Sequence, residues 1–218
     1  MRGLYAIVDV DFLRSAGVPP LLFAEALLPA RPAVVQLRAK SDSPRDVLEL
    51  LRALRPLCDR HRVPLFANDR PDLAVLAHCD GVHVGQDDLE VCDVRNFAPS
   101  LRVGVSTHNL SQLEEALSAN PDYVAFGPVF PTTSKEKPDK VVGLTGLAGA
   151  WARAKASGVP LVAIGGIDLA RAPEVAARAD LGAVISALLP AEGLVGVGAR
   201  AEALDLALGG DGADFRRS

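Results

Sequence analysis

Short runs of β-branched and apolar residues recur along the whole chain, and each is followed by glycine or polar residues and then by an amphipathic stretch. Runs that are apolar on both faces predict strands of a parallel sheet, because only helices on both sides of a sheet can bury both of its faces. Eight such strands are predicted, over residues 4–9, 33–38, 63–68, 81–85, 102–106, 123–127, 160–166 and 181–186. Helices are predicted over residues 21–29, 44–61, 71–78, 90–98, 109–119, 145–157, 170–178 and 191–208, with Ser43-Pro44 and Asn109 as N-terminal signals.

The alternation of eight strands with eight helices predicts an α/β fold, a single compact (β/α)8 TIM barrel. A chain of 218 residues, 49% of them hydrophobic, is long and apolar enough to bury one large core. An open, doubly wound sheet is the alternative, but it would carry GxGxxG after the first strand, where this chain reads VDFLRSAGVPP. We therefore predict one barrel domain over residues 1–208 and a flexible tail, GGDGADFRRS, over residues 209–218.

Charge and cysteine content narrow the range of partners. The net charge is −4, from 23 basic and 27 acidic residues, and the basic residues form no stripe, which argues against a nucleic-acid partner. No apolar run approaches the ~20 residues that span a bilayer, and the early acidic start MRGLYAIVDV does not predict a signal peptide. Cys58, Cys79 and Cys92 lack CxxC spacing and are interpreted as reduced structural thiols. We expect a cytoplasmic protein with no membrane partner.

Polar side chains follow the second predicted strand, at the face where barrels of this kind hold their active sites. Alternation along the strand places Gln36 and Arg38 on one side, directed toward the barrel mouth, and Lys40 joins them if the extended run continues beyond residue 38. Taken alone, such a run also occurs at solvated strand ends. Its position in the barrel favours a binding role.

Carboxylates follow the third and fourth strands. Asp69 and Asp88 could approach one Mg²⁺ ion, which typically takes one or two carboxylates together with phosphate oxygens and water. The alternative is that Asp69, and either Asp87 or Asp88, cap the helices that follow. An arginine, a lysine and a metal facing one pocket would fit a diphosphate, because separate cations neutralise charge on several oxygens.

The fifth strand ends in Ser106, which could bind a substrate heteroatom, and Thr107 or Asn109 is interpreted as the cap of the next helix. No Ser-His-Asp or Cys-His pattern supports His108 as a base. His83 lies between two valines and is interpreted as a hydrogen-bonded core residue.

Two later segments offer groups for anionic oxygens. The long polar linker over residues 128–142 is either an anion-binding loop or a disordered surface loop. The seventh and eighth strands end where barrels often bind a substrate phosphate through backbone N–H groups. The residues concerned are Thr132, Thr133, Ser134 and Lys135 in the linker, then Gly165, Gly166, Ile185 and Ser186. Two anion sites are thus predicted, one at strands two to four and one at strands seven and eight.

Several ordered motifs resemble the thiamine phosphate synthase family over about residues 4–189. They read QLRAK, ANDRPDLA, DGVHVGQDDL, GVSTH, YVAFGPVFPTTSK, AIGGI and VIS. The resemblance implies a transferase of thiamine biosynthesis that joins 4-amino-2-methyl-5-hydroxymethylpyrimidine diphosphate to 4-methyl-5-(2-hydroxyethyl)thiazole phosphate and releases pyrophosphate. It implies a dissociative substitution with Mg²⁺ as cofactor, and leaves homo-oligomer formation open.

The resemblance also implies a set of site residues. Asp69 and Asp88 would hold Mg²⁺, and Arg38, Lys40, Lys135 and Ser106 would be catalytic. Substrate binding would involve Gln36, Leu37, Arg38, Ala39, Lys40, Asn68, Ser106, Thr132, Thr133, Ser134, Lys135, Gly166, Ile185 and Ser186. One departure is the turn Arg178-Ala179-Asp180-Leu181-Gly182, where the family has Gly-Ala-Asp-Gly. The alternatives are a thiazole tautomerase on the same scaffold and a non-catalytic phosphate-binding barrel, neither of which needs Asp69, Asp88 and Lys135 together.

Overall fold

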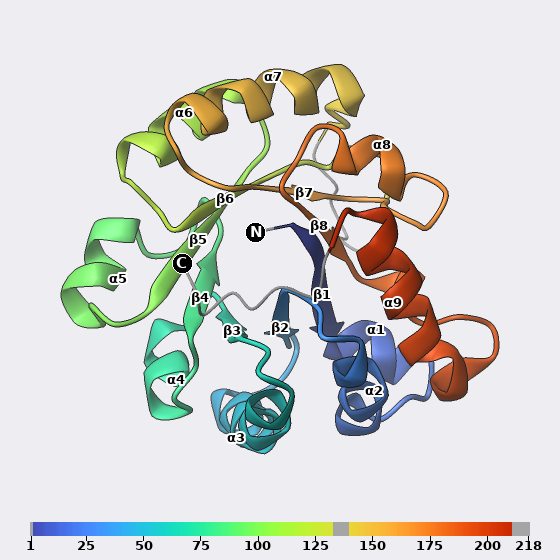
Figure 1. Ribbon diagram of the computed structural model, residues 1–218. Coiled ribbons are helices and arrows are strands. Elements are labelled where there is room, and N and C mark those ends of the chain that lie inside the picture. The colour runs from blue at the N-terminus through green and yellow to red at the C-terminus, as the bar shows by residue number, and fades with distance from the viewer. Residues whose placement is uncertain (1, 133–139, 211–218) are drawn as a thin grey trace.

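Eight parallel strands close into a barrel at the centre of the molecule, and helices form a ring around it (Figure 1). This computed structural model describes residues 2–132 and 140–210. Each strand pairs with the next and β8 pairs with β1, so the prediction of a (β/α)8 barrel is confirmed. The strands are β1 (Gly3–Asp9), β2 (Val34–Arg38), β3 (Leu65–Asn68), β4 (Gly81–Val84), β5 (Arg102–Thr107), β6 (Tyr123–Phe126), β7 (Leu161–Ile164) and β8 (Leu181–Val184). The helices are α1 (Val10–Ser15), α2 (Pro20–Leu27), α3 (Pro44–His61), α4 (Pro71–Leu76), α5 (Val91–Phe97), α6 (Leu110–Ser118), α7 (Gly143–Ala156), α8 (Ala172–Ala176) and α9 (Val197–Ala207), with short 3₁₀ helices η1 (Leu28–Ala30), η2 (Ser186–Leu188) and η3 (Gly193–Gly196).

Strand side chains alternate between two hydrophobic clusters, as the period of a strand requires. In β1, Leu4 and Val8 belong to the large cluster shared with the helices, whereas Tyr5 lies in a smaller cluster inside the barrel. The interior is filled rather than hollow, and small residues make room for large ones. A Cβ atom on Gly104 would lie 1.9 Å from the ring of Tyr123, so only glycine leaves space for that ring.

The sequence pattern missed helix α1, which lies in the segment VDFLRSAGVPP. Asp9 ends β1 and also caps this helix, because its carboxylate accepts a hydrogen bond from the Phe12 backbone N–H at 2.9 Å. The predicted caps of two later helices are confirmed, with Ser43 accepting from the N–H of Asp46 and Asn109 accepting from that of Gln112. The predicted helix over residues 191–208 is divided into η3 and α9.

A repeated aspartate contact ties the N-terminal ends of neighbouring strands together. The carboxylates of Asp80, Asp122 and Asp180, which directly precede β4, β6 and β8, accept the backbone N–H groups of Leu65, Val103 and Leu161 at 2.8, 2.8 and 2.9 Å. Each aspartate N–H also donates to the carbonyl of the same strand residue. Asp180 thus has a structural role in the turn at residues 178–182, where the sequence departs from the pattern Gly-Ala-Asp-Gly.

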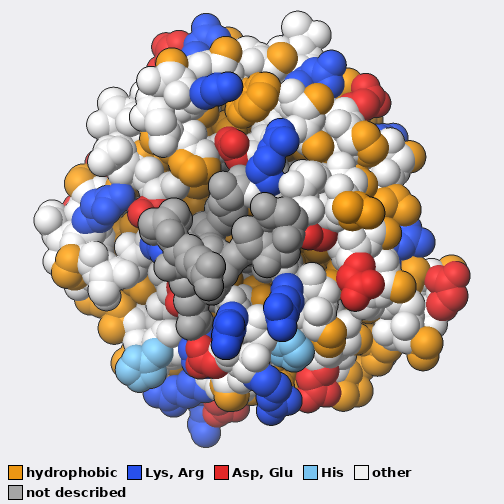
Figure 2. Space-filling view, in the orientation of Figure 1, with side chains coloured by type: hydrophobic (Ala, Val, Ile, Leu, Met, Phe, Trp, Pro, Cys, Tyr) orange, Lys and Arg blue, Asp and Glu red, His pale blue; other side chains and the backbone are white. Residues whose placement is uncertain are grey.

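On the face shown in Figure 2, basic and acidic side chains of the described residues are interspersed around the molecule. No helix among the residues that the structure describes is long and apolar enough to cross a membrane.

Candidate active site

A cavity of about 580 Å³ opens at the C-terminal ends of the strands, inside the ring of helices. That volume suits small organic ligands. The lining includes most of the residues that the sequence singled out: Gln36, Arg38, Lys40, Asn68, Asp69, Asp88, Ser106, Thr132, Gly166, Ile185 and Ser186. Thr133, Ser134 and Lys135 lie outside the described residues. The predicted alternation is confirmed through β2 and the two residues after it, because Gln36, Arg38 and Lys40 line the cavity. Leu37 and Ala39, which the resemblance implied as substrate-binding residues, belong to the hydrophobic packing and are not among the residues that line the cavity.

Two cations stand at the β2 edge of the cavity, and each is held by a carboxylate. The Arg38 guanidinium donates to Asp9 at 2.5 Å, and Asp9 is 3% exposed, so this pair is well shielded from water. The Lys40 ammonium pairs with Asp69. Asp9 lies opposite Arg38 in the pairing of β1 with β2, so the strand register places the Asp9 carboxylate beside the Arg38 guanidinium.

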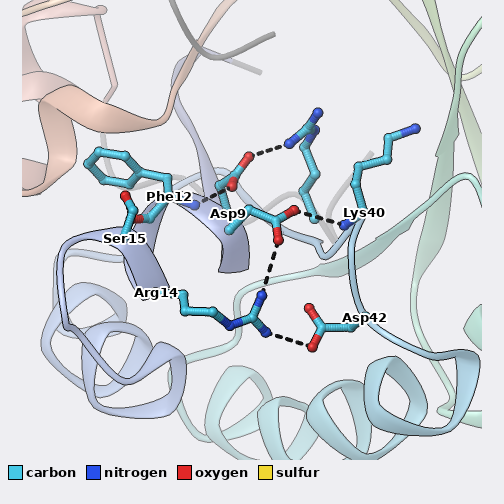
Figure 3. Close-up of polar contacts among 8 residues, drawn as sticks. Asp9, Phe12, Arg14, Ser15, Lys40 and Asp42 are labelled. Carbon is cyan, nitrogen blue, oxygen red and sulfur yellow. Dashed lines mark hydrogen bonds and ion pairs between the residues drawn. The ribbon is translucent and has the colours of Figure 1, made fainter. Parts of the chain in front are cut away.

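Helix α1 supports the segment that carries these cations (Figure 3). The Asp11 carboxylate accepts the backbone N–H of Lys40 at 3.3 Å, and Arg14 donates to Asp11 at 3.2 Å and to Asp42 at 2.7 Å. The Lys40 ammonium points away from these contacts (Figure 3). A short helix that the sequence pattern missed therefore anchors the β2–α3 loop through Asp11 and Arg14.

Asp69 and Asp88 form the acidic side of the cavity. Burial raises the pKa of the Asp69 carboxyl above its usual value, the Lys40 ammonium acts in the opposite direction, and the nearby Asp88 carboxyl raises that pKa further. Neither residue caps a helix, since Arg70 and Glu90 occupy those positions.

The backbone also marks Asp69 as a specialised position. Its φ of 61° lies in the left-handed region, which aspartate tolerates better than most residues, and its N–H donates to the His83 carbonyl at 2.8 Å. The Asp88 carboxylate accepts the Gly85 N–H at 2.7 Å. Two adjacent carboxylates, one with a raised pKa, fit a hard divalent cation, which would offset their mutual repulsion.

A series of hydrogen-bonded polar side chains crosses the barrel, and each of its members lines the cavity. The Tyr5 hydroxyl lies 2.7 Å from Gln36 Oε1 and 2.8 Å from the Tyr123 hydroxyl. Tyr123 lies 2.8 Å from His83 Nδ1, and His83 Nε2 lies 3.0 Å from the Ser106 hydroxyl. The prediction that His83 is a buried, hydrogen-bonded residue is confirmed, although His83 also lines the cavity.

Sequence reasoning missed both tyrosines, because they lie in the middle of apolar strands. They could have been found from the sequence, because each is a residue with a polar hydroxyl at an inward position of a predicted barrel strand. Tyr5 and Tyr123 are the only two tyrosines in the chain. His108 lines the cavity as well, and its Nδ1 lies 2.8 Å from the Gly127 carbonyl, to which it must donate.

Across the barrel, the glycine pair after β7 borders the same cavity. Gly166 has a φ of 64°, and a Cβ atom there would lie 2.5 Å from the Pro131 carbonyl oxygen, so a side chain would be strained and crowded. Ile185 and Ser186 follow β8 and line the cavity beside it. The two predicted anion-binding regions therefore face one cavity from opposite sides of the barrel.

Comparison with known proteins gives a consistent result. Residues 4–188 match the family model described as thiamine monophosphate synthase. The thiamine-phosphate synthase of Chloroflexus aurantiacus is 39% identical over 202 residues, covering 92% of this chain and 91% of the relative. That of Koribacter versatilis is 46% identical over 197 residues, covering 85% and 88%.

Among solved structures, thiamine phosphate pyrophosphorylase from Pyrococcus furiosus superposes with a TM-score of 0.83 at 32% identity, covering 95% of each chain. Tryptophan synthase subunit alpha from Legionella pneumophila superposes with a TM-score of 0.65 at 17% identity over 95% of this chain and 93% of that chain, and shares the fold alone.

Proposed function

The chain belongs to the thiamine monophosphate synthase family, and from this premise we propose that its cavity joins a 4-aminopyrimidine diphosphate to a thiazole phosphate and releases pyrophosphate. The enzyme is a thiamine-phosphate synthase, a transferase of thiamine biosynthesis. The observation that carries the substrate proposal is the pairing of two cations with two carboxylates at one side of a cavity whose other side is lined by Gly166 and Ser186.

The diphosphate would lie at the β2–β4 side. Arg38 and Lys40 would bind its oxygens, and both are held in place before substrate arrives, which is the condition for strong electrostatic stabilisation of a leaving group. Asp69 and Asp88 would hold Mg²⁺, which when bound neutralises charge on the diphosphate. Lys135 stays a predicted third cation outside the described residues.

The thiazole phosphate would lie at the β7–β8 side, with its phosphate near the backbone of Gly166 and the Ser186 hydroxyl. In the proposed dissociative substitution, the methylene carbon–oxygen bond of the pyrimidine breaks and the ring amino group spreads the positive charge. The thiazole nitrogen then attacks the carbon. An aromatic ring nitrogen is already nucleophilic, so the enzyme's task is to position two substrates rather than to supply a base. Cys58, Cys79 and Cys92 form no disulfide, which supports the proposed reducing, cytoplasmic setting.

The proposal is tested by incubating the purified protein with both substrates and Mg²⁺ and following both products. Thiamine phosphate and pyrophosphate are expected in equal amounts, and chelation of the metal is expected to stop both. Isomerisation of the thiazole without pyrophosphate release would overturn the proposal in favour of a tautomerase. Binding of both ligands without turnover would favour a non-catalytic barrel.

A further inference from the structure

The polar chain that lines the cavity links Asn68 to Ser106 through four other side chains. Gln36 Nε2 donates to Asn68 Oδ1 at 2.6 Å, and Gln36 Oε1 accepts from the Tyr5 hydroxyl at 2.7 Å. The chain then passes through Tyr123 and His83 to Ser106. It draws one residue from each of the strands β1 to β6.

Each hydroxyl has one hydrogen to donate, and this fixes the direction of the contacts from Gln36 to His83. Tyr5 uses its hydrogen on Gln36, so it must accept the hydrogen of Tyr123. Tyr123 must then accept from Nδ1–H of His83. In its neutral form, an imidazole protonated at Nδ1 carries a lone pair at Nε2, and His83 in that form accepts from the Ser106 hydroxyl.

The two ends of this chain face the cavity with opposite character. Asn68 Oδ1 is occupied by Gln36, which leaves the Asn68 amide hydrogens as donors toward a ligand. The hydrogen of Ser106 is occupied by His83, which leaves the Ser106 oxygen as an acceptor. The polar side chains couple Asn68 to Ser106, because reversing the donor and acceptor of one hydrogen bond reverses those of all the others.

We propose that Tyr5, Tyr123 and His83 are positioning residues that set this polarity, with a donor at Asn68 and an acceptor at Ser106. The site thereby selects a heterocycle that presents a ring-nitrogen acceptor beside an amino donor. A 4-aminopyrimidine carries that edge, whereas a 4-oxopyrimidine, protonated on the ring nitrogen, carries the reverse. The identity of the ligand rests on the proposed function, but the polarity itself does not.

Burial supports this arrangement. Tyr5 and Tyr123 are each 2% exposed, and burial raises the pKa of both hydroxyls above the usual value, so both stay protonated and able to donate. The His83 and Tyr123 rings stack with centroids 5.7 Å apart, which restrains the imidazole orientation. An unmade hydrogen bond at this depth would be costly, so the chain has reason to remain fully connected.

The polarity is tested directly by nitrogen NMR of the histidine rings in the ligand-free enzyme, with His83→Gln used to assign the His83 signals. A proton on Nδ1 and none on Nε2 is expected. A proton on Nε2 would reverse the chain and overturn the proposal. This measurement needs no catalysis, so the predicted tautomer in an enzyme that forms no thiamine phosphate would count against the proposed function alone.

Specificity gives a second test. Wild-type enzyme is expected to prefer the 4-amino over the 4-oxo pyrimidine diphosphate by about 10⁴-fold in kcat/KM, since unpaired buried polar groups disfavour the wrong analogue. Tyr123→Phe is expected to reduce this preference by about tenfold, the equivalent of about one hydrogen bond.

Thr107→Val is the matched control, because Thr107 is a buried residue of the same strand as Ser106 whose hydroxyl donates to the Ala125 carbonyl, outside the chain. It is expected to leave the preference unchanged even if stability falls. If Tyr123→Phe does not fold, Tyr5→Phe interrupts the same chain and is expected to reduce the preference in the same direction. An unchanged preference in a folded Tyr123→Phe or Tyr5→Phe enzyme would overturn the proposal.

Discussion

Asp69 and Asp88 can be tested as metal ligands one side chain at a time. Asp69→Ala and Asp88→Ala are each expected to lower kcat by about 10²-fold or more, while the fold survives, because each removes charge from the Mg²⁺ site. Asp88→Asn is expected to do the same, although its amide oxygen can still accept the Gly85 N–H. The measurement is pyrophosphate release across a Mg²⁺ titration.

The matched control is Asp72→Ala, which removes a nearby carboxylate that pairs with Arg70 at 2.5 Å on the surface. An exposed pair of this kind contributes little, so kcat is expected to stay within about twofold of wild type. Turnover close to wild type in Asp69→Ala and Asp88→Ala, with an unchanged response to Mg²⁺, would remove both residues as ligands.

The cysteines give a prediction about burial. Cys58 and Cys79 are buried, and burial raises the pKa of the Cys79 thiol to about 12, so almost none of the reactive thiolate forms near neutral pH. Cys92 is exposed. A thiol reagent is therefore expected to label one cysteine rapidly in the native protein and all three in urea. Rapid labelling of Cys79 in the folded protein would show that this region opens readily.

For individual residues, sequence reasoning succeeded where the two-residue period of a strand applies. It placed Gln36 and Arg38 of β2 on one side together with Lys40, two residues after the strand, and all three line the cavity. It did not find Tyr5 or Tyr123 as parts of the site, because a tyrosine in an apolar strand is equally compatible with packing alone. Only closure of the barrel brings their hydroxyls together.

Asp9, at the start of helix α1, has two roles that substitutions can separate. Its carboxylate caps α1 through Phe12 and pairs with Arg38 through the other oxygen. Asp9→Asn is expected to keep the cap and lose the charge, whereas Asp9→Ala loses both. The two variants are therefore expected to share a drop of about tenfold in kcat/KM for the pyrimidine diphosphate, the loss of about 1.4 kcal/mol. Asp9→Ala should be less stable than Asp9→Asn by about 1 kcal/mol.

Steady-state kinetics and urea unfolding of the same preparations provide both readouts. A wild-type kcat/KM in Asp9→Asn would show that Arg38 does not depend on this ion pair for its position. Equal stability of the two variants would instead contradict the capping role.

The long helix α3 was predictable, and so were the short helices α4, α5 and α8, but the short helix α1 was not. The helix over 44–61 matches α3 because eighteen residues carry a clear amphipathic pattern and a Ser-Pro start. Helix α1 has only six residues, and its start is set by Asp9, which the sequence presents as the end of a strand. Local patterns therefore fixed the order of elements more reliably than they fixed the short connections that position the cations.

On the scale of the whole molecule, the two ends of the barrel have different tasks. The cations, carboxylates and glycines of the cavity lie after the strands, whereas the aspartate contacts of Asp80, Asp122 and Asp180 lie before them. This division follows the general behaviour of the fold, in which one face carries chemistry and the other stability. The sequence indicated the closed topology through the number of βα units, but the aspartate pairs join residues 15 to 19 positions apart and appear only once neighbouring strands are in register.

Loss of these aspartates should therefore lower stability without lowering kcat. Asp122→Ala and Asp180→Ala each leave a strand N–H without its carboxylate partner, and each is expected to reduce the free energy of unfolding by about 1–3 kcal/mol. Asp122 also pairs with Arg95, whose side chain is 39% exposed, whereas Asp80 pairs at 2.6 Å with Arg55, whose side chain is only 13% exposed. Asp80→Ala should therefore cost the most, because it leaves the more buried arginine without this partner. Urea unfolding should show a lower midpoint with an unchanged slope.

Glu202→Ala, at an exposed position of α9, is the control and should change stability by less than about 0.5 kcal/mol. A large fall in kcat in folded Asp122→Ala or Asp180→Ala would show instead that strand register at the far end of the barrel controls the geometry of the cavity.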